Sequence, residues 1–148
     1  MTKKSDGTQK NQGAFRVKSS KISGATYLDI ERKARKSYQI IAHHTKRIPY
    51  VRSAYWRKDK IFLNLFWTHL NQKYRAERKR RLKYFDCGIE LLRHSTIEPE
   101  TRDNPNGTNE LVHRFSGQTA DGQIFWVQVK ENKRTGAKWL MSIFSKDK

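Results

Sequence analysis

The sequence predicts an α+β fold in which N-terminal basic helices pack on a small C-terminal antiparallel β-meander of about three strands. Apolar residues recur every three or four positions through much of residues 25–94, which is the spacing of amphipathic helices. Residues 110–145 instead alternate apolar with polar side chains, and an Asp-Gly and a Thr-Gly pair supply two tight turns. The connection over 95–109 is polar and contains Pro and Gly, so it marks the change from helices to strands.

The helical part contains three patterns. The first helix is expected to begin after Thr26 as its N-cap and to run to about Lys46. The stretch "RIPYVRSAYWRK" that follows is expected to be a loop with aromatic anchors. A second helix is predicted from about Asp59. The third is predicted from the apolar residues Leu82, Phe85, Ile89 and Leu92.

The charge is distributed unevenly along the chain. The net charge is +18, and residues 85–148 contain nine cations and nine carboxylates, so the whole excess lies in residues 1–84. Residues 1–24 are predicted to form a disordered basic arm, which leaves residues 25–148 as a single domain. Lys and Arg gain affinity by releasing counterions from phosphates, so nucleic acid is the predicted partner, with RNA favoured.

The composition also restricts the compartment and the cofactors. The chain has one cysteine, Cys87, and hence no intrachain disulfide, which favours a reducing compartment. Neither an apolar leader nor a run of about 18 apolar residues is present, so a cytoplasmic protein without a membrane partner is expected. A glycine-rich phosphate loop and a His-rich metal spacing are both lacking, so no cofactor and no metal are expected.

A dense run of cations, "RAERKRRLK", lies between the second and third helical patterns. Its six positive charges oppose a single Glu77, and such a run repels itself unless an anion is near. We expect it to bind phosphates, although a solvated helix face is the simpler interpretation. The six residues are Arg75, Arg78, Lys79, Arg80, Arg81 and Lys83.

Alternation assigns each strand residue to a face once the register is chosen. Pairing Phe115 with Phe125 and Val129 with Trp139 places His113 on the helix-covered face. The opposite face is then polar and suits a bound nucleotide, with Trp126 available for stacking on a base. Its predicted members are Val112, Arg114, Ser116, Trp126, Gln128, Lys130, Lys138, Leu140 and Ser142.

The segments "HRF", "VQVKE" and "MSIF" after a series of basic helices resemble the phage and bacterial barnase/EndoU/colicin/RelE-like endoribonucleases. The resemblance covers about residues 27–144 and implies a metal-independent endoribonuclease, with an antitoxin or immunity protein as a further partner. In that family the sheet presents a His, an Arg or Lys, and a hydroxyl residue. The matching positions are His113, Arg114, Lys130 and Ser142.

These residues suggest a specific chemistry. His113 would transfer a proton, and Arg114 with Lys130 would neutralise charge on the phosphate. A histidine between apolar neighbours is also typical of a buried structural residue, and His43, His44 and His69 have less support as candidates. A non-catalytic nucleic-acid-binding module remains an alternative, and so does an adaptor that binds another protein. In the binding module Lys138 and the basic run would contact phosphates.

Overall fold

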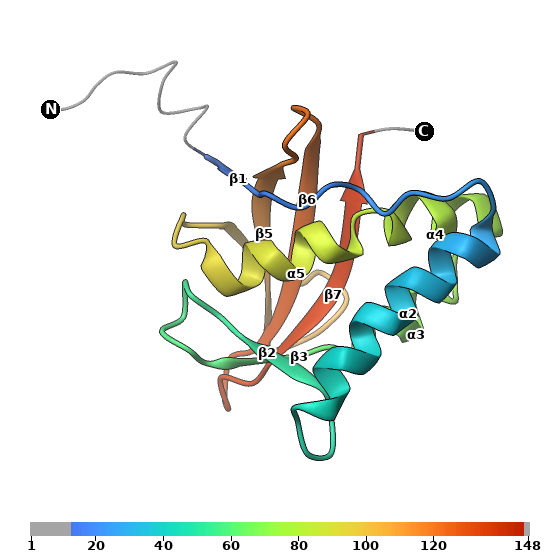
Figure 1. Ribbon diagram of the computed structural model, residues 1–148. Coiled ribbons are helices and arrows are strands. Elements are labelled where there is room, and N and C mark those ends of the chain that lie inside the picture. The colour runs from blue at the N-terminus through green and yellow to red at the C-terminus, as the bar shows by residue number, and fades with distance from the viewer. Residues whose placement is uncertain (1–12, 147–148) are drawn as a thin grey trace, which may run out of the picture.

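Seven strands form one curled sheet in the computed structural model, which describes residues 13–146 (Figure 1). The strand order is β1-β5-β6-β7-β3-β2, and β4 pairs with β5 beside β1. The strands are β1 (Ala14–Arg16), β2 (Tyr50–Arg52), β3 (Lys60–Phe62), β4 (Glu100–Asp103), β5 (Glu110–Gln118), β6 (Ile124–Asn132) and β7 (Lys138–Ser145). Four helices lie in the same described range: α2 (Tyr27–His43), α3 (Asn64–Leu70), α4 (Arg75–Leu82) and α5 (Phe85–His94).

The predicted fold class is therefore wrong in its sheet. The C-terminal strands β5, β6 and β7 do form an antiparallel meander, but it is the centre of a larger sheet. β1 and β3 add to the outer strands in parallel, and β2 extends the sheet beyond β3. The sheet thus recruits strands from the segments that were predicted as an arm, a loop and the start of the second helix.

The meander has the predicted faces over β5 and β6. Phe115 pairs with Val127 and not with Phe125, a slip of two residues that leaves every side chain on its predicted face. Phe115, Val127 and His113 are buried on the face that α5 covers, as alternation predicts. Figure 1 shows α5 lying across this face, with α2 beside it.

A β-bulge in β7 changes the faces at one end of that strand. Gln128 pairs with Ser142 but the next residue, Val129, pairs with Leu140, so Met141 is the extra residue. Ser142 keeps its predicted face. Lys138 and Leu140 instead turn to the core, where both are buried, and the prediction of Lys138 on the exposed face was wrong because of this bulge.

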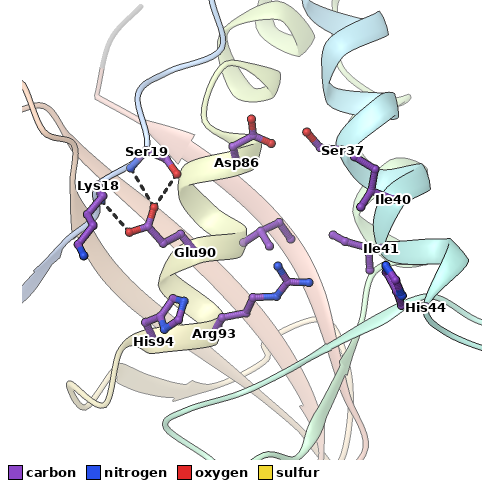
Figure 2. A pocket seen from close by; sticks show the side chains of 11 residues that line it. Lys18, Ser19, Ser37, Ile40, Ile41, His44, Asp86, Glu90, Arg93 and His94 are labelled. Atoms are coloured by element: carbon purple, nitrogen blue, oxygen red, sulfur yellow. Dashed lines mark hydrogen bonds between the residues drawn. The ribbon is translucent and has the colours of Figure 1, made fainter.

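Residues 13–24 are ordered along the sheet and α5, whereas a disordered arm was predicted over 1–24; residues 1–12 lie outside the described range. Val17 and Ile22 are buried. The Glu90 carboxylate accepts hydrogen bonds from the backbone N–H groups of Lys18 (2.7 Å) and Ser19 (2.9 Å), and from the Ser19 hydroxyl (Figure 2). Burial alone would raise the pKa of Glu90, but these hydrogen bonds outweigh it and hold the pKa below its usual value.

The helices follow their local patterns where those patterns are long. Thr26 caps α2 as predicted, with its hydroxyl accepting from the N–H of Asp29 at 3.2 Å. The predicted second helix from Asp59 was wrong at its start, because Lys60–Phe62 pairs with β7 as a strand. α4 and α5 are separate helices that meet at Lys83 and Tyr84.

Replacing Gly117 with Ala is expected to lower the free energy of unfolding by about 1–3 kcal/mol. A Cβ at this position of β5 would collide with the Phe125 ring and with Leu91 of α5. Urea denaturation measures the change, with Ser116→Ala on the opposite face of the same strand as the matched control. Wild-type stability in the Gly117→Ala protein would contradict the close packing of α5 on the sheet.

Candidate nucleic-acid interface

The face of the meander opposite α5, which we call the open face, carries the candidate site. Arg114, Gln128 and Ser142 are direct neighbours across β5, β6 and β7. They contribute to a hollow of about 280 Å³ that we call the Arg114 hollow. The α3 helix and the connection to α4 bound it with His69 and Lys73, and α4 adds Arg81.

The hollow gathers positive charge without a carboxylate. The described residues that line it include three cations and one histidine but no Asp or Glu. The guanidinium groups of Arg81 and Arg114 both lie over the Phe144 ring, at 5.5 and 5.6 Å from its centroid. Two guanidinium groups within 5.6 Å of one ring centroid bring positive charge to the same hollow, which favours an anion there, although Arg81 also pairs with Glu77 at 2.7 Å.

Gln128 and Ser142 supply neutral hydrogen-bonding groups at the floor of the hollow. The Ser142 hydroxyl donates to the Gln128 side-chain oxygen at 2.9 Å. This bond orients the Gln128 amide, whose N–H₂ group has two further donors. The pair can therefore accompany the arginines in binding phosphate oxygens.

His69 is the titratable group of the hollow. Burial lowers the pKa of His69, and the charges of Lys130, Lys73 and Arg81 lower it further. The C-terminal end of a helix ordinarily favours a charged imidazole, so these effects outweigh the position of His69 in the last turn of α3. The imidazole is consequently neutral near pH 7 and able to accept a proton.

A second hollow of about 250 Å³ adjoins the first and shares Arg114, Gln128 and Met141 with it. β4 and the loop after it form its other wall, where Glu100 and Asp103 bring negative charge. Both carboxylates are in ion pairs, Glu100 with Arg102 at 3.3 Å and Asp103 with Lys133 at 2.6 Å. The cationic end of the combined groove is thus the Arg114 hollow.

His113 lies on the other side of the sheet from Arg114. Its Nδ1 is 2.8 Å from the Thr101 hydroxyl and its Nε2 is 2.6 Å from the Glu131 carboxylate. The ring packs edge-on against Trp56, 4.8 Å between centroids, and only 6% of the residue is exposed. The predicted convergence of His113 with Arg114 and Lys130 is therefore wrong, because adjacent residues of a strand point to opposite faces.

Lys138 belongs to the same buried network as His113. Its ammonium group donates to Asp59 at 3.0 Å and to the Gly136 carbonyl at 2.9 Å, and it lies 3.8 Å from Glu131. It also lies over the Trp56 ring, 5.0 Å from the centroid. This lysine is not available to a ligand on the open face.

Lys130 and Trp126 occupy the open face as predicted. Lys130 forms an ion pair with Glu110 at 3.4 Å and lies over Trp139, 5.7 Å from the ring centroid. Trp126 packs against Phe144 with 5.6 Å between centroids. Both side chains are half-buried and flank the row of Arg114.

The cations of α4 divide between internal contacts and the hollow. Arg75 and Arg78 lie over the Tyr27 ring of α2, at 4.8 and 5.5 Å. Lys79 donates to the Ala25 carbonyl at 3.0 Å. Arg80 and Arg81 share Glu77, at 2.5 and 2.7 Å, while Lys83 directly follows the helix and its carbonyl accepts from Ile22. Of the predicted six, Arg81 is the one that lines the Arg114 hollow.

A larger hollow of about 650 Å³ lies between α2, α5 and the segment before α2 (Figure 2). Arg93, His94 and His44 line it together with Asp86 and Glu90, so its charges are mixed. Glu90 is already engaged with Lys18 and Ser19. Volume alone does not make this hollow a better candidate than the smaller one, whose described lining has no carboxylate.

Residues 13–146 show neither a metal-binding cluster nor a membrane-crossing helix. No three His, Cys, Asp or Glu side chains in this range gather closely enough to hold a metal ion. None of its helices is both long and apolar enough to span a bilayer.

His69 and Lys73 were not predicted as site residues. They come from α3 and the residues after it, far in sequence from β5 to β7. No periodicity reveals that α3 packs along β7, so only the excess of cations over residues 1–84 pointed toward them.

Replacing His113 with Ala is expected to lower the free energy of unfolding by about 2–4 kcal/mol, since it leaves a cavity beside Trp56 and removes the hydrogen bonds to Thr101 and Glu131. Chemical denaturation measures the loss. Arg114→Ala, at the adjacent half-buried position, is the control and should change stability by less than about 1 kcal/mol. Equal stability of the His113 variant and the wild type would argue against a structural role.

NMR titration is expected to place the pKa of His69 below 6.5. Lys73→Gln should raise that pKa, because it removes one of the repelling charges. Lys133→Gln, which removes a lysine paired with Asp103, serves as the control and should leave it unchanged. A His69 pKa above 6.5 in the wild type would contradict the desolvated cationic hollow.

Comparison with known proteins gives no further assignment: no family model, no curated protein and no solved structure matches the chain.

Proposed function

We propose that this protein binds RNA in the Arg114 hollow and cleaves it there without a metal ion. The observation that supports this most directly is the convergence of Arg81, Arg114 and Lys73 with a histidine of lowered pKa, on a hollow whose described lining has no carboxylate. Cations alone would support binding to any polyanion. A neutral histidine among them adds a base that can act on a hydroxyl next to a bound phosphate.

RNA carries such a hydroxyl and DNA does not. The 2′-hydroxyl of RNA attacks the adjacent phosphorus when a base takes its proton, and His69 is the base that the hollow offers. Negative charge then builds on the phosphate oxygens, where Arg81 and Arg114 stabilise it. Lys73 lines the same hollow and supplies an ammonium proton for the leaving 5′-oxygen.

This proposal changes the residues implied by the resemblance while retaining the open face of the sheet. Arg114 and Ser142 stay in the site, and Lys130 contributes positive charge near His69. His113 is replaced by His69 as the proton-transfer group, because His113 is enclosed between Thr101, Glu131 and Trp56.

We expect single-stranded RNA to be cleaved by the purified protein in EDTA, with products ending in a cyclic 2′,3′-phosphate. His69→Gln should reduce kcat at least a hundredfold with little change in RNA affinity, because a proton-transfer group acts mainly in the transition state. Arg114→Ala should weaken both binding and cleavage. His94→Gln, an exposed histidine on α5, is the matched control. RNA that is bound tightly but stays intact would reduce the proposal to a binding module.

The pH dependence of cleavage follows from the same histidine. Since burial and its cationic neighbours lower the pKa of His69, kcat/KM should rise with pH to a half-maximal value below pH 6.5 and then level off. A bound phosphate raises the pKa of the imidazole, so the kcat profile should be displaced to higher pH. Initial rates between pH 4.5 and 8 measure both profiles, and a pH-independent rate would remove His69 from the mechanism.

A further inference from the structure

The open face is organised in rows that cross the paired strands. Trp126 pairs with Phe144 in one row, and Gln128 lies between Arg114 and Ser142 in the next. In the third row Trp139 lies between Lys130 and Phe62, and Phe62 pairs with Tyr50. Successive rows are two residues apart along β6, which is about 7 Å, and the bulge at Met141 takes up the extra residue on β7.

Aromatic side chains thus lie on both sides of the arginine row. Trp126 and Phe144 form the first platform, with 5.6 Å between ring centroids and a tilt of 33°. Trp139 and Phe62 form the second at 6.4 Å, and Tyr50 continues it at 6.2 Å from Phe62. We call these the Trp126 platform and the Trp139 platform.

The platform rings differ from the core aromatics in their exposure. Phe66, Phe85 and Phe125 are at most 1% exposed, whereas all five platform residues are half-buried. Apolar rings that cluster on one face and stay partly exposed to water are unfavourable, and such a patch is typical of a surface that a ligand covers. The charged residues around the rings indicate the chemistry of that ligand.

Cations border each platform. Arg81 and Arg114 lie over Phe144 in the first. In the second, Lys130 lies over Trp139, and Lys60 and Arg52 lie 4.6 and 5.4 Å from the Tyr50 centroid. Rings that alternate with cations match a chain in which bases alternate with phosphates.

We propose that the open face binds single-stranded RNA with one phosphate at Arg114 and with the two neighbouring bases stacked on the Trp126 and Trp139 platforms. This inference rests on the proposed function, since it uses the same phosphate position. A duplex cannot bind in this way, because its bases are stacked on one another and their faces are covered. The platforms therefore select unpaired RNA, while Arg114 fixes the phosphate between two of its bases.

The test measures affinity separately from cleavage. A labelled single-stranded RNA with 2′-O-methyl groups, which cannot undergo 2′-hydroxyl attack, is titrated in EDTA and compared with its duplex and with single-stranded DNA of the same sequence. We expect the single-stranded RNA to bind at least tenfold more tightly than the duplex. Trp126→Leu and Trp139→Leu should each weaken single-strand binding about tenfold. Trp126→Phe and Trp139→Phe keep an aromatic ring and should retain most of the affinity.

The matched control is Tyr74→Ala, which removes an aromatic residue that is 89% exposed outside the platforms. A second arm leaves the protein unchanged and replaces two neighbouring bases of the RNA by abasic sites, which should cause a similar loss. That arm keeps the proposal testable if a Trp variant fails to fold. Equal affinity for the single strand and the duplex would contradict base stacking on the platforms. So would full affinity of both Leu variants together with full affinity for the abasic RNA.

The outcomes also separate the platforms from the proposed function. RNA binding that depends on Arg114 but on neither tryptophan would refute base stacking on the platforms and would still support phosphate binding in the Arg114 hollow. Absence of binding to any of the oligonucleotides at low salt would overturn both. Tight binding of single-stranded DNA with the same dependence on Trp126 and Trp139 would overturn the assignment of RNA as the occupant.

Discussion

The nine-residue pairing of β5 with β6 is the constraint on which the rest of the molecule depends. It fixes which side chains face α5 and which face away. β1, β4 and β7 pair with this hairpin, β3 pairs with β7, and β2 extends the sheet from β3. Because side chains alternate, one register places His113 in the core and Arg114 outside it. The buried network and the open face are thus two consequences of one ladder of hydrogen bonds.

The distribution of charge shows how a chain with a net charge of +18 folds without an equal number of acids. Aromatic faces take several cations in place of carboxylates, as Tyr27 does for Arg75 and Arg78. Other cations bind backbone carbonyls, as Lys79 does at Ala25. In the Arg114 hollow, Arg81 and Arg114 also lie over an aromatic ring, that of Phe144, but there they converge with Lys73 on open space. We regard that convergence, more than the total charge, as the feature that distinguishes a binding site from a basic surface.

The sequence was informative where structure is local. The α2 helix with its Thr26 cap and the faces of β5 and β6 follow from periodicity alone. It was uninformative for strands as short as β2 and β3, since three residues show no period and their pairing partner lies far along the chain. The same distinction holds for the candidate site. Alternation along β5 and β6 placed Arg114, Lys130 and Trp126 on the correct face of the sheet. His69 was given less support than His113, because the packing of α3 beside β7 is a tertiary contact that the sequence pattern does not show.

The bulge at Met141 has a consequence for how β7 tolerates insertions and deletions. Side chains of a strand alternate between the two faces of the sheet, and one unpaired residue exchanges the faces of all residues on one side of it. Loss of Met141 would join Leu140 directly to Ser142 and give a regular ladder with the same pairs, so every side chain of β7 would keep its present face. If Met141 instead paired regularly with Val129, Leu140 would turn to the open face and Trp139 toward α5, so the bulge sets the phase between the arginine row and the second aromatic platform.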